Sequence, residues 1–223
     1  IAAALADGVS HLKGYTPCGD NEAALKVARS LGAEVELNGK ELTIKGISAS
    51  LGSLSQLYDE NGASAATEDG TPVLHVGESG LLTRMMIPLM TQLCQGPVHF
   101  TGEKTLLGRP LTGAKEILEA FEARVIREDD EAPVCVPLTA TGPLKAGRAE
   151  ISGKHGSQLI SGLLMALPFA ERNSSLIVHE PKSIPYMFIT LEVLKKFGIR
   201  IGNDMLGGPD FLASDGDWSL CTE

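Results

Sequence analysis

The sequence is poor in aromatic residues and in basic charge. Aromatic residues make up only 4% of the 223 residues, so aliphatic side chains must fill the core. The chain has 19 basic residues against 28 acidic ones, which gives a formal net charge of −9. Because it carries neither a basic excess nor a basic stripe, we expect no nucleic-acid partner. An acidic chain can still bind an anion through a local cluster of donors.

Cysteine pairs and membrane-spanning runs are missing as well. The four cysteines show neither a CxxC pair nor the spacing of metal ligands, so we expect free thiols in a reducing compartment and no metal site. These are Cys18, Cys94, Cys135 and Cys221. No apolar run is long enough to span a bilayer. The first eight residues resemble the end of an amphipathic helix rather than a signal peptide, and we expect the chain to begin inside an element.

Internal repetition is the most informative pattern that the sequence does contain. Three segments each run from a helix end through a small or polar break into a strand, and then into another helix. The strand and the end of that helix are 19, 21 and 19 positions apart, at Leu12 and Leu31, Phe100 and Phe121, and Val178 and Phe197. A β-rich stretch follows each helix, with a hairpin expected at Asn38-Gly39 and a pairing of 124–126 with 134–136.

A second helix in each repeat is apolar nearly all round. Residues 81–93 and 159–167 carry leucine, isoleucine and methionine on more than one face, which is typical of a buried helix. We therefore predict an α/β (α+β) fold of three βαβαββ units around buried helices. The units span roughly residues 1–75, 76–150 and 151–223, all within one domain.

The buried helices begin in glycine-containing turns, at Gly80 and at Gly156. A helix N-terminus offers free N–H groups to a phosphate or carboxylate, and glycine lets the backbone approach the ligand. The alternative is that Ser79 and Ser157 simply cap their own helices.

Several side chains near these turns could bind an anion. Arg109, in a loop before a helix, has the planar fork that grips a carboxylate. Arg84 lies on an apolar helix, so it either extends to solvent or pairs with an acid or an anion. The hydroxyls of Ser183 and Tyr186 could cap a helix or bind a polyol. His155 could be a general base or an ordinary surface histidine.

Taken in order, these motifs resemble the 5-enolpyruvylshikimate-3-phosphate synthase family. The resemblance rests on the Gly80 turn with Arg84, Thr101-Gly-Glu103 followed by Arg109-Pro110, Gly156-Ser-Gln158, and Ser183-x-Pro-Tyr186, and it covers roughly residues 1–203. It implies one domain of a two-domain enzyme without metal or organic cofactor. That enzyme moves the enolpyruvyl group of phosphoenolpyruvate to the 5-hydroxyl of shikimate 3-phosphate in the cytoplasm, in the pathway to aromatic amino acids.

The resemblance also implies which residues bind each substrate. Shikimate 3-phosphate would contact Ser157, Gln158, Ser183 and Tyr186. Phosphoenolpyruvate would contact Gly80, Arg109 and Gln158, with Arg84 and Gly156 in support. The family's early Gly-x-Lys-Ser-x-Ser-x-x-Arg stretch and its second domain are not in this sequence, so we expect a truncated chain that binds without turnover and holds no catalytic residue.

Two positions depart from the family pattern, and other functions stay open. Gly156 replaces a serine, Phe188 replaces an acid, and residues 204–223 match nothing firmly. One alternative is the sister enzyme that acts on UDP-N-acetylglucosamine. That enzyme typically carries a reactive cysteine in the loop before its Arg-Pro, and residues 103–109 here contain no cysteine. Another is a non-catalytic module that binds an anionic metabolite. A purely structural repeat protein is disfavoured by the positions of Arg109 and Gln158.

Overall fold

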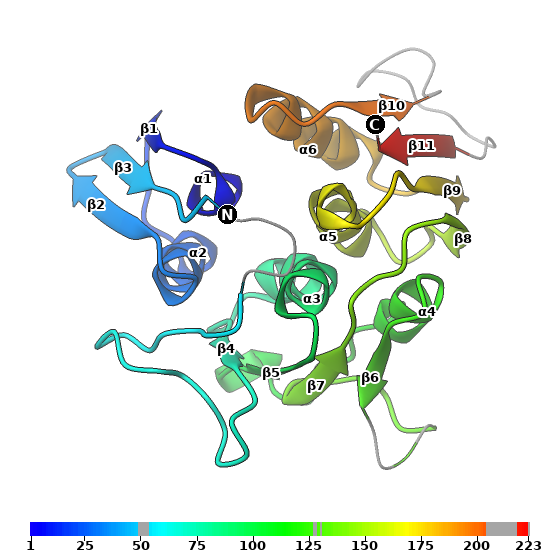
Figure 1. The fold of residues 1–223 in the computed structure, drawn as a ribbon, viewed down its shortest axis with the longest axis horizontal. Helices are drawn as coiled ribbons and strands as arrows, with labels where there is room; N and C mark the ends of the chain where they lie inside the picture. The colour runs from blue at the N-terminus through cyan, green and yellow to red at the C-terminus, as the bar shows by residue number, and fades with distance from the viewer. Residues whose placement is uncertain (49–53, 127–128, 130, 204–217, 223) are drawn as a thin grey trace.

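The fold is that of a computed structural model, which describes residues 1–48, 54–126, 129, 131–203 and the backbone of 218–222. Figure 1 shows three sheets around a centre of helices. Residues 204–217 and 223, and the side chains of residues 218–222, lie outside the described part of the chain.

Two four-stranded sheets share one strand order. The first consists, in spatial order, of β4 (Val73–His75), β5 (Pro97–Thr101), β7 (Leu138–Thr141) and β6 (Arg124–Ile126). The other consists of β8 (Arg148–Ser152), β9 (Ser175–His179), β11 (Trp218–Thr222) and β10 (Ile201–Asn203). In both, the first two strands are parallel and the remaining pairs are antiparallel.

A three-stranded antiparallel sheet has the same order as the last three strands of each four-stranded sheet. Its order is β1 (Val9–Lys13), β3 (Glu41–Lys45) and β2 (Glu34–Asn38). In each sheet one helix joins two strands that are not neighbours: α2 (Gly19–Ser30) joins β1 to β2, α4 (Ala114–Glu119) joins β5 to β6, and α6 (Ile184–Lys196) joins β9 to β10. Strand β4 (Val73–His75) pairs with β5, and β8, which starts at Arg148, pairs with β9, so each of these sheets includes residues before 76 or 151.

The apolar helices lie at the centre, as their composition predicts. These are α3 (Gly80–Cys94) and α5 (Gln158–Ala166), which continues into the short η2 (Leu167–Phe169), while α1 (Ala2–Leu5) lies beside them (Figure 1). A Cβ on Gly162 would lie 2.5 Å from the carbonyl oxygen of Met85 and 2.5 Å from Cγ of Pro88. Gly162 therefore allows α5 to approach α3 closely.

A buried amide joins these helices to their neighbours. Gln92 of α3 is 3% exposed; its Nε2 donates to the carbonyl of Phe169 at 2.9 Å, and its Oε1 accepts from the Leu144 N–H at 2.9 Å. Both ends of the amide are satisfied, so its burial costs little.

The hairpin prediction is confirmed, and one strand prediction is wrong. Gly39 adopts φ +63° in a two-residue turn between β2 and β3. Residues 134–136 do not pair with β6, whose partner is β7. Instead the carbonyl of Val134 accepts from the Leu111 N–H at 2.8 Å, and Val136 bridges Leu107. This stretch therefore holds the loop that carries Arg109, helped by the 3₁₀ turn η1 (Lys104–Leu106).

The described cysteines carry free thiols. They are Cys18, Cys94 and Cys135, while the side chain of Cys221 lies outside the described residues. Burial raises the pKa of the Cys94 thiol to about 12, so it remains protonated at neutral pH. Within the described ranges, no helix is long and apolar enough to cross a membrane, and no group of three His, Cys, Asp or Glu side chains is arranged to hold a metal ion.

Candidate functional site

The turn before α3 is held by a capping serine. The Ser79 hydroxyl accepts from the Leu82 N–H at 3.1 Å and donates to the Asp20 carboxylate of α2. The Thr83 hydroxyl donates back to the Ser79 carbonyl at 2.6 Å. At Ser79 the capping alternative is therefore correct, and the next residue, Gly80, begins the helix in a fixed position.

Two guanidinium groups meet at Gly80. Arg84 Nη1 donates to the Gly80 carbonyl at 2.9 Å, and Arg84 Nη2 donates to the Pro110 carbonyl at 3.0 Å. A Cβ on Gly80 would lie 3.1 Å from Arg84 Nη1 and 3.3 Å from Arg109 Nη1. Glycine at this position thus leaves room for both arginines beside the backbone, which makes the start of α3 electropositive.

The electrostatics of this pair favour an anion. Burial lowers the pKa of the Arg84 guanidinium from its usual value, and the positive charge of Arg109 lowers it further. An arginine nevertheless stays charged at neutral pH. Two adjacent positive charges repel each other, so a carboxylate or phosphate between them would relieve the repulsion.

The start of α5 differs from that of α3. Ser157 is 4% exposed, and its hydroxyl neither caps the helix nor hydrogen-bonds to another described residue. A buried hydroxyl without a partner is costly, and a phosphate oxygen would satisfy it. Gln158 follows as the first, half-buried residue of the helix.

The loop after Arg109 lies against the turn that leads into α5. A Cβ on Gly113 would lie 3.2 Å from His155 Cδ2 and 3.5 Å from Leu159 Cδ1. The Arg109 loop therefore bridges the starts of α3 and α5, because Arg84 holds it on one side and His155 packs on the other. His155 lies against this glycine without an acid partner in the described residues, which does not support a role as general base.

Ser183 and Tyr186 stand at the start of the neighbouring helix α6. Ser183 adopts φ +58° and makes no cap, and Tyr186 is 64% exposed. The loop before α5 is fastened to the loop before α6, since the Gly153 N–H donates to the His179 carbonyl at 2.7 Å and Lys154 pairs with Glu180 at 2.7 Å. The two helix starts therefore belong to one surface.

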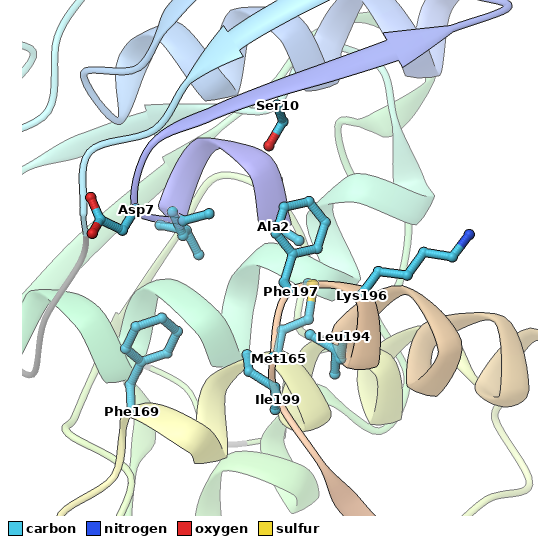
Figure 2. Close-up of a pocket in the computed structure, with 12 residues that line it drawn as sticks. Ala2, Asp7, Ser10, Met165, Phe169, Leu194, Lys196, Phe197 and Ile199 are labelled. Atoms are coloured by element: carbon cyan, nitrogen blue, oxygen red, sulfur yellow. The ribbon is translucent and has the colours of Figure 1, made fainter.

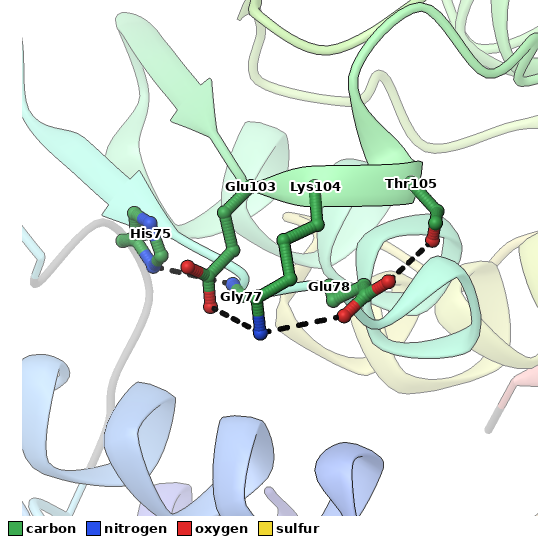
Figure 3. Close-up of polar contacts among 6 residues, drawn as sticks. All are labelled: His75, Gly77, Glu78, Glu103, Lys104 and Thr105. Carbon is green, nitrogen blue, oxygen red and sulfur yellow. Dashed lines mark hydrogen bonds and ion pairs between the residues drawn. The ribbon is translucent and has the colours of Figure 1, made fainter.

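A polar network that the sequence analysis missed lies beside Gly80. Lys104 Nζ lies 3.6 Å from Glu78 Oε2 and 4.0 Å from Glu103 Oε1, and the Thr105 hydroxyl donates to Glu78 Oε1 at 2.5 Å (Figure 3). The Thr105 hydrogen bond is the main cause that lowers the pKa of the Glu78 carboxyl, and Lys104 adds to it. Glu78 is 26 positions from Lys104 and 27 from Thr105, so spacing could not reveal these two contacts.

The network sets the charge next to the guanidinium pair. We expect Lys104→Ala to weaken phosphate binding to the chain, and Glu78→Gln to strengthen it, each by roughly two- to fivefold at low salt, because each changes one exposed charge near the site. Isothermal calorimetry with inorganic phosphate measures both. Equal affinities for the two variants would show that the network does not act on the anion.

Comparison with known proteins identifies the relatives of this chain. The profile of the family described as EPSP synthase (3-phosphoshikimate 1-carboxyvinyltransferase) matches residues 1–207. The chain belongs to the EPSP synthase family. Two relatives named 3-phosphoshikimate 1-carboxyvinyltransferase come from Methanococcus maripaludis (strain C7), 30% identical, and Clostridium kluyveri, 33% identical. Each match covers 90% of this chain but only 43% and 42% of the relative.

Solved structures agree on the fold. The EPSP synthase of Acinetobacter baumannii superposes with a TM-score of 0.69 and 24% identity, over 98% of this chain and 42% of that one. The α/β architecture is therefore that of EPSP synthases. The chain spans less than half the length of these relatives.

Both departures from the EPSP synthase pattern have a local structural setting. Gly156 adopts φ +97°, a conformation that L-residues rarely adopt, so the backbone here favours glycine over the family's serine. Phe188 packs partly buried against the core. Among the predicted residues, Gly80, Arg84 and Arg109 come together directly, and Ser157 and Gln158 share the start of α5. Ser183 and Tyr186 lie on the adjoining helix start.

Proposed function

We propose that this chain forms the substrate-binding domain of an EPSP synthase and binds both anionic substrates at the starts of its helices. The meeting of Arg84 and Arg109 at Gly80 is the observation that carries the proposal. The buried Ser157 hydroxyl, which no described residue hydrogen-bonds, supports it. Among the described residues, Arg84 and Arg109 have no acidic partner and the Ser157 hydroxyl has no hydrogen-bond partner; a bound carboxylate or phosphate would supply both.

In this proposal phosphoenolpyruvate lies on the guanidinium pair. Arg109 is exposed and free to close on the carboxylate as a planar fork, whereas Arg84 is already committed to two carbonyl groups. Arg84 thus adds positive charge to the site, while Arg109 contacts the carboxylate of phosphoenolpyruvate. The Gly80 backbone and Gln158 complete this half of the site.

Shikimate 3-phosphate would lie on the adjoining helix starts. The Ser157 hydroxyl and the free N–H groups of α5 suit its phosphate, and Gln158, Ser183 and Tyr186 offer donors and acceptors for its hydroxyls. Because Gln158 lies on both halves, it would bring the two substrates together. Proximity of the reacting atoms is the main contribution that such a domain can make.

The reaction itself requires groups that we assign to a second domain of the same enzyme. The 5-hydroxyl gives its proton to a base as its oxygen adds to C2 of phosphoenolpyruvate, and C3 takes a proton from an acid. The adduct then loses a proton from C3 and phosphate from C2. These steps need an acid and a base close to the substrates. None of the proposed site residues on this chain supplies a carboxylate for proton transfer, so we expect substrate binding here without turnover.

Calorimetry tests the binding proposal. Shikimate 3-phosphate should bind the chain weakly, and Ser157→Ala and Gln158→Ala should each weaken it by roughly tenfold, because each removes a hydrogen bond to a charged or polar group. Ser152→Ala, at an exposed strand end, is the matched control and should bind normally. Binding of UDP-N-acetylglucosamine instead would favour the sister enzyme, which the names of the relatives do not support.

A turnover assay tests whether the reaction requires the second domain. Phosphate release from phosphoenolpyruvate and shikimate 3-phosphate should stay at the buffer background with this chain alone. Measurable product would contradict the assignment of proton transfer to a second domain. A cytoplasmic location accords with the free thiols and remains part of the proposal.

A further inference from the structure

The Arg109 loop, residues 102–110, lies against the turn that leads into α3. Near its beginning, the Glu103 N–H donates to the Gly77 carbonyl of that turn at 2.9 Å. At its other end, Arg84 of α3 donates to the carbonyl of the last loop residue at 3.0 Å. Both ends of the loop are therefore fixed through backbone groups, and its middle depends on other contacts.

A buried side chain and a carboxylate hold the middle of the loop. Leu106 is 0% exposed and packs in the core. The Glu78 carboxylate lies between two neighbouring side chains of the loop (Figure 3). The Thr105 hydroxyl donates to its Oε1 at 2.5 Å, and Lys104 Nζ lies 3.6 Å from its Oε2. Glu78 thus joins the turn before α3 to the short η1.

The backbone of the loop needs such contacts. Lys104 adopts φ +52°, in the left-handed region that residues with a side chain rarely occupy. A residue stays in this region when the surrounding structure holds it there. Because Glu78 contacts both Lys104 and its neighbour Thr105, its carboxylate holds the strained turn in place.

The position of Arg109 depends on this turn. Its N–H donates to the Leu106 carbonyl at 3.1 Å, so the residue follows directly from η1. Its side chain is exposed and makes no hydrogen bond or ion pair with another described residue. Its Nη1 nevertheless lies only 3.3 Å from where a Cβ on Gly80 would stand. The place of the guanidinium beside Gly80 is therefore set by the loop that carries it.

We propose that Glu78 is a positioning residue for the phosphoenolpyruvate half of the site. By accepting the Thr105 hydrogen bond it keeps the Arg109 loop against the start of α3, and the guanidinium of Arg109 stays beside Gly80. Glu78 does not touch the substrate, and its negative charge by itself opposes an anion. Its contribution to binding is the hydrogen bond that holds the loop. The inference rests on the proposed function, which assigns phosphoenolpyruvate to Arg109.

Two substitutions of Glu78 separate position from charge. Glu78→Gln loses the charge but keeps an oxygen that accepts from Thr105, so phosphoenolpyruvate should bind as to the wild type or up to roughly fivefold more tightly. Glu78→Ala loses the same charge together with the acceptor, and binding should weaken roughly fivefold because the loop is released. A role through charge alone predicts that both variants bind alike. NMR titration with phosphoenolpyruvate measures each Kd.

Thr105 supplies the other side of the same test. Thr105→Val keeps the shape of the side chain and loses the hydroxyl, so phosphoenolpyruvate should bind roughly fivefold more weakly. Thr105→Ser keeps the hydroxyl and should bind nearly as the wild type does. Glu78→Ala combined with Thr105→Val should bind no more weakly than Thr105→Val alone, since both substitutions break one hydrogen bond.

Ser10→Ala is the control for the loss of a hydroxyl. Ser10 lines a cavity of about 460 Å³ between α1 and β1 on one side and the ends of α5 and α6 on the other (Figure 2). The lining of this cavity includes neither the Arg109 loop nor the turn before α3. Phosphoenolpyruvate should therefore bind this variant as it binds the wild type.

Hydrogen exchange without ligand tests the loop separately. The Arg109 amide should exchange roughly threefold faster or more in Glu78→Ala and in Thr105→Val, and at the wild-type rate in Glu78→Gln. Equal phosphoenolpyruvate affinities for Glu78→Gln and Glu78→Ala would overturn the inference, as would unchanged exchange at Arg109 in Glu78→Ala. A wild-type chain that does not bind phosphoenolpyruvate would instead overturn the proposed function, and with it this role of Glu78.

Discussion

Replacing Arg109 with Gln is expected to weaken phosphoenolpyruvate binding to this chain by roughly 10- to 100-fold, because a charge-assisted, bidentate contact is lost. Gln is of similar length but has neither the charge nor the fork. The Arg84 guanidinium cannot take its place, since it is tied to the carbonyl groups of Gly80 and Pro110. NMR titration with phosphoenolpyruvate measures the change in Kd.

Two further variants make the Arg109 result specific. Arg109→Lys keeps the charge and loses the fork, so it should fall between the wild type and Arg109→Gln. Arg124→Gln removes an exposed arginine on β6 and should bind as the wild type does. If Arg109→Gln binds phosphoenolpyruvate normally, the guanidinium pair is not the site.

Gly162→Ala should destabilise the fold by about 3 kcal/mol, because overpacking a tight contact forces the surrounding backbone to move. The new methyl group would lie 2.5 Å from both the Met85 carbonyl oxygen and Pro88 Cγ, at the contact of the two central helices. For a domain of this size the melting temperature should fall by roughly 6–12 °C. Thermal unfolding followed by circular dichroism measures it.

Gly19→Ala is the matched control for this substitution. Gly19 is also a helical glycine, at the start of α2, but a Cβ there meets nothing within 4 Å. Its replacement should leave the melting temperature unchanged or slightly raise it, because alanine favours the helix more than glycine does. Equal effects at both positions would mean that the contact between α3 and α5 is looser than described.

The parts of the fold with a strong local pattern could be predicted from the sequence. The all-apolar segments identified the central helices α3 and α5, since no exposed helix tolerates such a surface. The spacing predicted a strand followed by a helix around residues 12–31, 100–121 and 178–197, and the structure has β1 and α2, β5 and α4, and β9 and α6 there. At the site, Gly80, Arg84 and Arg109 could be singled out because glycine at a helix start and arginine in an apolar helix each require a reason.

Features that depend on distant partners could not be predicted. Residues 134–136 have the composition of a strand, yet they pair with the Arg109 loop, and only the folded chain brings that loop beside them. The bond from Ser79 to Asp20 and the pairing of Glu78 with Lys104 likewise join separate segments. The roles of Ser157, Gln158, Ser183 and Tyr186 rest on family resemblance and on their common surface.

The central claim is that both substrates bind at the helix starts of this domain, and amide chemical shifts during titration with shikimate 3-phosphate test it most directly. Saturable shifts should gather at residues 156–158 and 183–186, and shifts at residues 80 and 109 should follow when phosphoenolpyruvate is added. The first set should become much smaller in Ser157→Ala at the same ligand concentration. Saturable shifts confined to other surfaces, or unchanged by that substitution, would contradict the account.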